Sequence, residues 1–262
     1  MSSSMSFMST PSAAKQLAEE HPKRVVVKQN SREVAASSVF VDCSTIDIAT
    51  SNNIRDAVNQ KCASAKFYDC PLSGGSLGAE NGTLAFMLGC GSDDCNIEVL
   101  EEILSMMGNP IILCGGPSLS LLAKFCNNYC SGLITIATSE AFNIAISHGM
   151  DPRVLHKIFK TSTAGSTIND KWNPVPGLYP DAPASHGYQG GFRIQLMRKD
   201  FALAVDAASQ VGARLTLADT ALKVYTEASE DPSCKDLDSR VIFRYLGGNE
   251  DWAVDRSVSQ AD

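Results

Sequence analysis

The spacing of apolar residues changes character near residue 117. Ahead of this point, short apolar runs alternate with helical patterns. From residue 118 to residue 149, apolar residues recur at steps of three and four with no proline among them, which is typical of an amphipathic helix. A single helix of about thirty residues is therefore predicted. The chain has to fold as two regions of different type.

The first region contains four runs with the composition of buried strands. These runs are residues 38–43, 65–70, 83–90 and 110–116. One helical pattern runs through about residue 60 and another covers residues 96–108, and the short polar side chains of Ser44, Thr45 and Asp47 can cap the first of these helices. Strands that alternate with helices predict a mainly parallel sheet with helices on its faces. Residues 38–117 are therefore predicted to form part of a doubly wound, Rossmann-type α/β domain.

The second region, residues 118–262, is predicted to be all-helical. Further helical patterns after the long one cover residues 151–161, 195–211, 214–229 and 236–246. A segment rich in proline and glycine, residues 173–192, lies among them and is too long to be a simple connector. Residues 1–37 are mostly polar and are predicted to be a disordered N-terminus.

The composition limits the classes of partner. A formal net charge of -7 offers no basic surface for nucleic acid or anionic membrane, and no apolar stretch reaches the ~18 residues that span a bilayer. The nine cysteines include no CxxC pair, so neither a disulfide framework nor a metal site is predicted. The serine-rich residues 1–15 weakly resemble an organelle transit peptide, although they lack arginine. Small, soluble molecules are the expected ligands.

Residues 71–82, PLSGGSLGAENG, concentrate four glycines beside a predicted strand. The Ser73 hydroxyl and the bare backbone of Gly74 and Gly75 can approach an anion closely, and such loops follow strands where open α/β sheets bind ligands. A tight turn between strands explains the same composition. Residues 74–78 also match GxSxG with Ser76 as a nucleophile, but a strand and no helix is predicted to follow, which disfavours a hydrolase.

Two pairs of polar residues lie in predicted helices. Lys124 and Asn128 are one helical turn apart, so a lysine able to exchange a proton and an amide able to orient an oxygen share one strip of the long helix. The same strip could equally face water. Lys199 and Asp200 could direct a cation at a cofactor, or could form a charged pair on the surface.

Taken in order, these motifs resemble those of the 3-hydroxyisobutyrate dehydrogenases, which belong to the β-hydroxyacid dehydrogenase family. The motifs are VDCSTID (41–47), DCPLSGGSLGAENGTLAFMLG (69–89), KFCNN (124–128), NPVPG (173–177), GYQGGF (187–192) and LMRKD (196–200). The resemblance implies a partial Rossmann-type domain followed by a helical domain of the 6-phosphogluconate dehydrogenase type. It also implies NAD-dependent oxidation of a small hydroxy acid.

The resemblance assigns roles to the residues of the substrate site. Ser73, Gly74 and Gly75 match the family's loop that holds the substrate carboxylate. Lys124 matches the catalytic lysine, and Asn128 matches the residue that orients the substrate hydroxyl. The implied substrate is 3-hydroxyisobutyrate, an intermediate of valine breakdown in mitochondria. Relatives with similar loops act on tartronate semialdehyde or glyoxylate, so the identity of the acid stays open.

The resemblance also concerns the cofactor and the partners. Thr45 and Lys199 match positions that contact NAD in the family. The family's glycine fingerprint for the pyrophosphate, GxGxxG, occurs nowhere in this chain. A shortened gene product, a non-catalytic remnant and an incorrect start site each account for that. The helical domain is expected to associate with its own copies or with a full-length paralogue.

Overall fold

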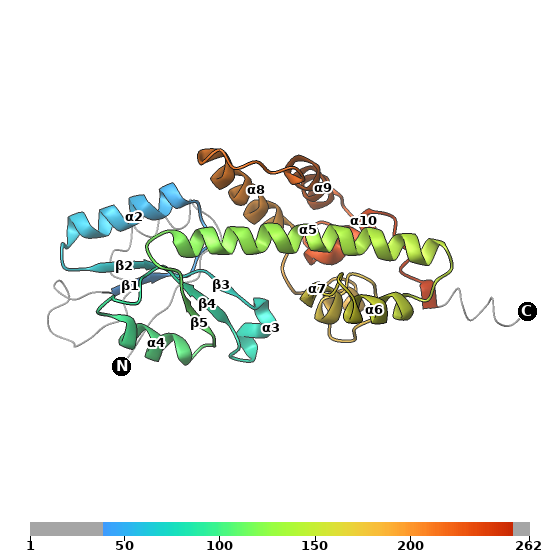
Figure 1. The fold of residues 1–262 in the computed structure, drawn as a ribbon, viewed down its shortest axis with the longest axis horizontal. Coiled ribbons are helices and arrows are strands. Elements are labelled where there is room, and N and C mark those ends of the chain that lie inside the picture. The colour runs from blue at the N-terminus through green and yellow to red at the C-terminus, as the bar shows by residue number, and fades with distance from the viewer. Residues whose placement is uncertain (1–38, 254–262) are drawn as a thin grey trace, which may run out of the picture. The chain divides into compact units, whose positions relative to one another are not determined.

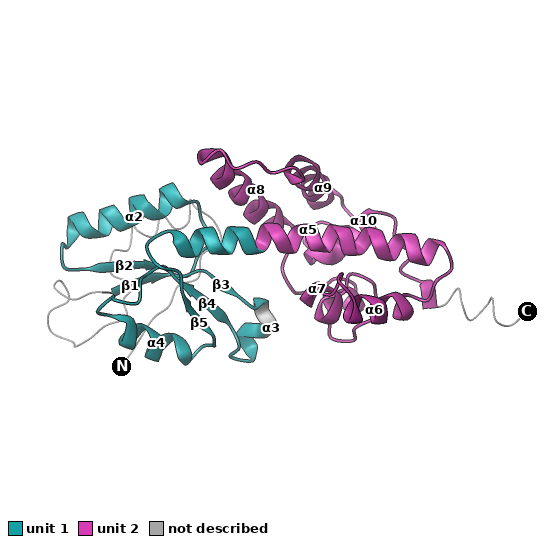
Figure 2. Ribbon diagram, viewed as in Figure 1, with its two compact units in different colours: residues 1–127 teal, residues 128–262 magenta. Residues whose placement is uncertain are grey.

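The computed structural model describes residues 39–253, which divide into two compact units (Figures 1 and 2). The division follows Asn127, inside the long helix α5 (Leu119–Ser147), rather than near residue 117. The start of α5 belongs to unit 1 because it is hydrogen-bonded to Asp69. The Ser118 amide donates to Asp69 Oδ1 at 3.0 Å, and the Ser120 hydroxyl donates to the Asp69 carbonyl at 3.0 Å.

Unit 1 begins with two parallel strands and a helix that crosses between them, as the sequence predicts. The elements are β1 (Val39–Asp42), α2 (Ile48–Lys61) and β2 (Lys66–Asp69). The strands pair with Asp42 opposite Asp69. Asp47 caps α2, since its carboxylate accepts the Thr50 amide at 2.7 Å.

The rest of unit 1 forms a second sheet with two helices. Its elements are β3 (Leu72–Ser73), α3 (Gly75–Glu80), β4 (Ala85–Leu88), α4 (Ile97–Ser105) and β5 (Ile111–Leu113). The strand order is β3-β4-β5, with β4 and β5 parallel and β3 antiparallel to β4. Within residues 39–253 the strands thus form two sheets, whose pairings are mainly parallel as predicted, and the antiparallel strand β3 is the one that the sequence pattern misses.

The prediction that no helix follows the glycine-rich loop is wrong. The helix α3 starts directly at Gly75, and Ser76 lies inside it. The sequence pattern concealed this helix because it is short and contains two glycines, which are weak helix formers. Gly78 N–H nevertheless donates to the Gly74 carbonyl at 3.0 Å and closes a helical turn. Ser76 therefore lies within a short helix and not on the turn between a strand and a helix, and the predicted strand, β4, follows residues 71–82.

Unit 2 is all-helical and contains the later part of α5. The further helices are α6 (Pro152–Thr161), α7 (Thr167–Lys171), η1 (Pro183–His186), α8 (Ile194–Gln210), α9 (Ala218–Glu230), η2 (Ser239–Val241) and α10 (Ile242–Tyr245). The sequence patterns predict α5, α6, α8 and α9 but miss the short α7 and η1. The helix predicted for residues 236–246 begins only at Ser239, because Asp238 caps it and accepts the Arg240 amide at 2.9 Å.

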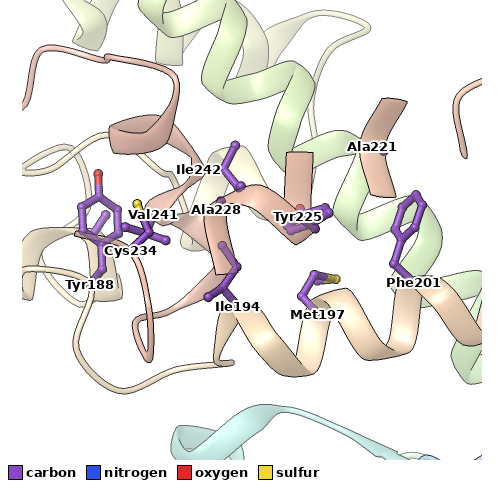
Figure 3. Packing of buried hydrophobic residues seen from close by; sticks show 11 residues of the cluster. Tyr188, Ile194, Met197, Phe201, Ala221, Tyr225, Ala228, Cys234, Val241 and Ile242 are labelled. Carbon is purple, nitrogen blue, oxygen red and sulfur yellow. The ribbon is translucent and has the colours of Figure 1, made fainter. Parts of the chain in front are cut away.

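Large aromatic side chains fill the core of unit 2 (Figure 3). Phe201 and Tyr225 are fully buried there, with ring centroids 5.9 Å apart, and each contributes about 1.5–3 kcal/mol by its burial. Gly132 lets both rings approach α5, since a Cβ at this position would lie 3.1 Å from Phe201 and 3.3 Å from Tyr225. The Tyr225 hydroxyl donates to the Gly132 carbonyl at 2.9 Å. The packing of these helices therefore depends on one glycine.

No helix among residues 39–253 combines the length and apolar character needed to cross a membrane. Within the same range, no three His, Cys, Asp or Glu side chains come together as metal ligands could.

Candidate active site

The glycine-rich loop of unit 1 follows β3 and opens α3. Ser73 is half-buried, while Gly74 and Gly75 are exposed. Their φ angles are +137° and +63°, which a residue with a side chain rarely adopts. A Cβ on Gly74 would also lie 3.1 Å from the Leu84 side chain. The loop thus presents backbone to solvent at a point where other residues would be strained.

Asp69 connects this loop to the helix that carries Lys124. The residue ends β2, four positions before Ser73, and its carboxylate accepts hydrogen bonds from the Ser118 amide and the Ser120 hydroxyl. The carboxylate fits because Gly89 has no side chain: a Cβ there would lie 2.6 Å from Asp69 Oδ2. One buried side chain therefore fixes the start of α5 to the strand that leads into the loop.

Lys124 and Asn128 occupy successive turns of α5 and are both buried, with exposed fractions of 7% and 5%. The polar strip to which they belong is buried farther along as well, at Thr135 and Thr138. The alternative that this strip faces water is wrong. The sequence could not exclude it, because a polar strip on a helix ordinarily does face water.

Asp200 holds Asn128 in place. The Asn128 amide nitrogen, Nδ2, donates to Asp200 Oδ2 at 2.6 Å, and Lys199 Nζ lies 2.9 Å from Asp200 Oδ1. Asp200 is 1% exposed and lies in α8 on the same face as the buried Met197 and Phe201. The prediction that Lys199 and Asp200 form a surface pair is therefore wrong for Asp200. Its spacing of three from Met197 is the sequence signal that could have revealed its burial.

This contact fixes which way the Asn128 amide points. A carboxylate only accepts hydrogen bonds, so the nitrogen has to face Asp200 and the oxygen is directed elsewhere. The Asn128 oxygen, Oδ1, therefore lies on the side of the amide away from Asp200. An oxygen held in this way is suited to accept a hydrogen bond from a hydroxyl group.

Thr45 lies half-buried in the turn between β1 and α2. Within the described part of the chain, the buried hydroxyl of Ser51, in the first turn of α2, makes no hydrogen bond. Buried hydroxyls without partners are uncommon and indicate room for a polar ligand group. Ligands of parallel α/β sheets bind at this carboxyl end of the strands. Thr45, the predicted dinucleotide contact, lies at this end of β1.

The carboxylate at the end of β1 has a perturbed acidity. Burial raises the pKa of Asp42 above its ordinary value, and the Asp69 carboxylate raises it further. Hydrogen bonds from Ser44, including the amide at 3.0 Å from Asp42 Oδ1, act in the opposite direction.

Of the predicted site residues, the structure brings Asn128 and Lys199 together on Asp200, and it places Lys124 one turn from Asn128. Ser73, Gly74 and Gly75 are consecutive in unit 1: Ser73 ends β3, Gly74 lies between the two elements, and Gly75 begins α3. Thr45 lies in a separate turn of that unit. The role of each residue remains a prediction.

Two protein-family models match the chain. Residues 9–116 match the NAD binding domain of 6-phosphogluconate dehydrogenase, and residues 121–246 match the NAD-binding domain of NADP-dependent 3-hydroxyisobutyrate dehydrogenase. The second match contains Lys124, Asn128, Lys199 and Asp200.

Named relatives and a solved structure agree with these models. A probable mitochondrial 3-hydroxyisobutyrate dehydrogenase from Dictyostelium discoideum is 40% identical, over 88% of this chain and 71% of the relative. The mitochondrial 3-hydroxyisobutyrate dehydrogenase of Homo sapiens is 36% identical, over 84% of this chain but only 64% of its own length. The Mycobacterium tuberculosis 3-hydroxyisobutyrate dehydrogenase solved with L-serine superposes with a TM-score of 0.78 at 28% identity, over 92% of this chain and 77% of that one.

Proposed function

This chain belongs to the 3-hydroxyisobutyrate dehydrogenase family, and we propose that it oxidises the hydroxyl carbon of a small 3-hydroxy acid with a nicotinamide dinucleotide. The observation that carries the proposal is the buried Asp200, which orients Asn128 one turn away from Lys124. Burying an oriented amide and a lysine side by side costs free energy that a helix with a purely structural role can avoid by burying apolar side chains.

The substrate carboxylate is assigned to the loop of Ser73, Gly74 and Gly75. The Ser73 hydroxyl and the exposed backbone of the two glycines can donate hydrogen bonds to the carboxylate oxygens. Binding the carboxylate there leaves the hydroxyl end of a short acid for other residues. We assign a small acid, in which only a few atoms separate the carboxylate from the hydroxyl group.

Proton transfer is assigned to Lys124. In its neutral form the amine accepts the proton of the substrate hydroxyl, and burial favours the neutral form of a lysine in general. Asn128 Oδ1 accepts a hydrogen bond from the same hydroxyl and so fixes its direction. Asp200 acts through Asn128 and keeps its nitrogen turned away from the substrate.

Thr45 and Lys199 are assigned to the dinucleotide, with the buried hydroxyl of Ser51 as a further polar contact. The nicotinamide, when bound, supplies the acceptor for the hydride of the hydroxyl carbon. The chain contains no GxGxxG sequence for the pyrophosphate. The affinity for the dinucleotide is therefore expected to be low unless another chain contributes to the site.

We assign 3-hydroxyisobutyrate as the acid, NAD as the cofactor and valine catabolism in mitochondria as the setting. The names of the relatives from Dictyostelium discoideum and Homo sapiens support the acid and the location. Tartronate semialdehyde and glyoxylate remain alternatives, since one methyl or hydroxyl group changes binding by only about 1–3 kcal/mol.

The absent GxGxxG sequence favours a second candidate, a non-catalytic partner that associates with a full-length paralogue or with its own copies. Sedimentation of this chain mixed with such a paralogue tests it. A mixed species without turnover supports the partner role, whereas independent sedimentation contradicts it.

Calorimetric titration of NAD and NADP into the purified chain tests the enzymatic proposal, followed by 3-hydroxyisobutyrate and the absorbance of the reduced cofactor. Lys124→Ala should lower turnover by about 10²–10⁴-fold, because it removes the proton acceptor. Lys223→Ala, at a side chain 74% exposed in α9, is the matched control and should leave turnover unchanged. Dinucleotide binding with undiminished turnover in Lys124→Ala would contradict the assigned role.

A further inference from the structure

Four of the nine cysteines follow the carboxyl ends of strands in unit 1. Cys43 follows β1, Cys70 follows β2, Cys114 follows β5, and Cys90 lies two positions after β4. All four are free thiols. None of them has a role in the proposed reaction, so their placement after the carboxyl ends of four strands requires a separate explanation.

Cys43 and Cys70 form a close pair. They continue the parallel register in which Asp42 lies opposite Asp69, and the Cys70 amide donates to the Asp42 carbonyl at 2.7 Å. Their side chains are hydrogen-bonded to each other and lie in the same buried cluster. Neighbouring strands lie about 4.8 Å apart, which is within the Cα separation of roughly 4.4–6.8 Å that a disulfide requires.

We propose that Cys43 and Cys70 are an oxidation site whose two thiols close to a disulfide in the presence of a peroxide. The Cys43 sulfur attacks one peroxide oxygen and forms an S–O bond while the O–O bond breaks, and the departing oxygen takes up the thiol proton and leaves as water. The Cys70 sulfur then attacks the Cys43 sulfur, and the S–O bond breaks to release a second water. Two thiols are oxidised, one peroxide is reduced, and the chain loses two hydrogens.

The environment sets the order and the rate of these steps. Cys43 is 7% exposed and Cys70 is fully buried, so a small peroxide reaches Cys43 first. The hydrogen bond with Cys43 and, next, burial raise the pKa of Cys70 well above its ordinary value. Cys70 therefore stays a thiol at neutral pH, and ring closure accelerates as the pH rises.

The position of the pair gives the disulfide a consequence for the proposed function. Cys43 directly precedes the turn with Ser44 and Thr45, and Cys70 lies three positions before Ser73. A disulfide between them covalently links the residue before the turn assigned to the dinucleotide to a residue just before the loop assigned to the substrate. This consequence rests on the proposed function, whereas the disulfide itself does not.

Peptide mapping tests the disulfide on the full chain. The protein is treated with hydrogen peroxide at neutral and at alkaline pH, its remaining thiols are alkylated after unfolding, and two proteases are used so that Cys70 is separated from Cys90. We expect a peptide that links Cys43 to Cys70, formed faster at the higher pH. The link should be absent from Cys70→Ala and retained in Cys62→Ala, a half-buried thiol outside the pair.

Other results would overturn the proposal. Oxidation confined to the exposed Cys95, Cys126 and Cys130, with Cys43 and Cys70 still alkylatable, would do so, as would a link between Cys70 and Cys90 or Cys114. Because the mapping is done on the wild-type chain, its result does not depend on whether the variants fold. Titration of NAD into the reduced and oxidised proteins tests the consequence separately: absence of binding by the reduced chain contradicts the proposed function and leaves the disulfide result intact.

Discussion

The two units carry their candidate functional groups in different ways. In unit 1, apart from Lys124 on α5, the groups lie where strands end, and Gly74 and Gly75 leave backbone exposed there. In unit 2 they are side chains within helices, where Asn128 and Lys199 meet on the buried Asp200. The first arrangement depends on local backbone conformation. The second depends on two helices, α5 and α8, that lie far apart in the sequence.

This difference shows where a mutation should have its effect. A glycine loop can lose its ligand-binding geometry at a modest cost in stability, because a turn contains little buried surface. A buried carboxylate that holds two partners cannot be removed without taking a hydrogen-bond or ion-pair contact from both of them. Changes in unit 2 should therefore alter stability and function together, while changes in the loop should separate them.

The largest effect on stability is expected at Asp200. Asp200→Ala should lower the free energy of unfolding by about 3–5 kcal/mol, because Asn128 loses its acceptor and Lys199 loses its counter-ion. Denaturant unfolding measures the change, and Asp206→Ala, at an exposed position of the same helix, should stay within about 0.5 kcal/mol of the wild type. The free energy of unfolding of Asp200→Asn should lie between those of the Asp200→Ala and Asp206→Ala variants, since the new amide oxygen can still accept a hydrogen bond from Asn128. Equal stability of the Asp200 and Asp206 variants would remove the contrast between the units.

A smaller effect is expected in the loop. Gly74→Ala should cost about 2 kcal/mol, because its φ of +137° and the contact with Leu84 both oppose a Cβ. Gly75→Ala should cost about 1 kcal/mol, since its φ of +63° is strained but nothing lies within 4 Å.

Gly82 provides the control for the loop, with the same φ of +63° and the same open surroundings as Gly75. Gly82→Ala should match Gly75→Ala in stability and leave the KM for the hydroxy acid unchanged, whereas Gly75→Ala should raise that KM. Identical KM values for the two variants would contradict the assigned substrate loop.

The smallest effect is expected at Asp42. Its pKa is raised in the folded protein, so the folded state binds a proton more tightly than the unfolded state does. Stability should therefore fall as the pH rises from the ordinary value of 3.8 through the raised pKa. Asp42→Asn should remove this dependence of stability on pH. At neutral pH its free energy of unfolding should equal that of the wild type or exceed it by about 1 kcal/mol or less.

Unfolding midpoints at several pH values measure this contribution. Asp181→Asn, at an exposed position, should keep the slope of the wild type. A slope that Asp42→Asn leaves unaltered would mean that other carboxylates cause it.

Local sequence patterns predicted the long helices and the apolar strands, but they missed the short helices and the shortest strand. The uninterrupted periodicity of apolar residues predicted α5, and apolar runs and capping residues predicted β1, β2 and α2. The helices α3 and α7, of six and five residues, are too short to show a period. The antiparallel β3 of two residues carries no alternation at all.

The sequence by itself determined the two-region architecture and the family, because ordered motifs and periodicity are local properties that survive in a linear chain. It also marked Lys124, Asn128 and the glycine loop through those motifs. Only the tertiary structure decided that the polar strip of α5 is buried and that Asp200 holds both Asn128 and Lys199. It likewise decided that Cys43 and Cys70 are neighbours. Burial and pairing depend on which distant segments pack together, and no window of neighbouring residues contains that information.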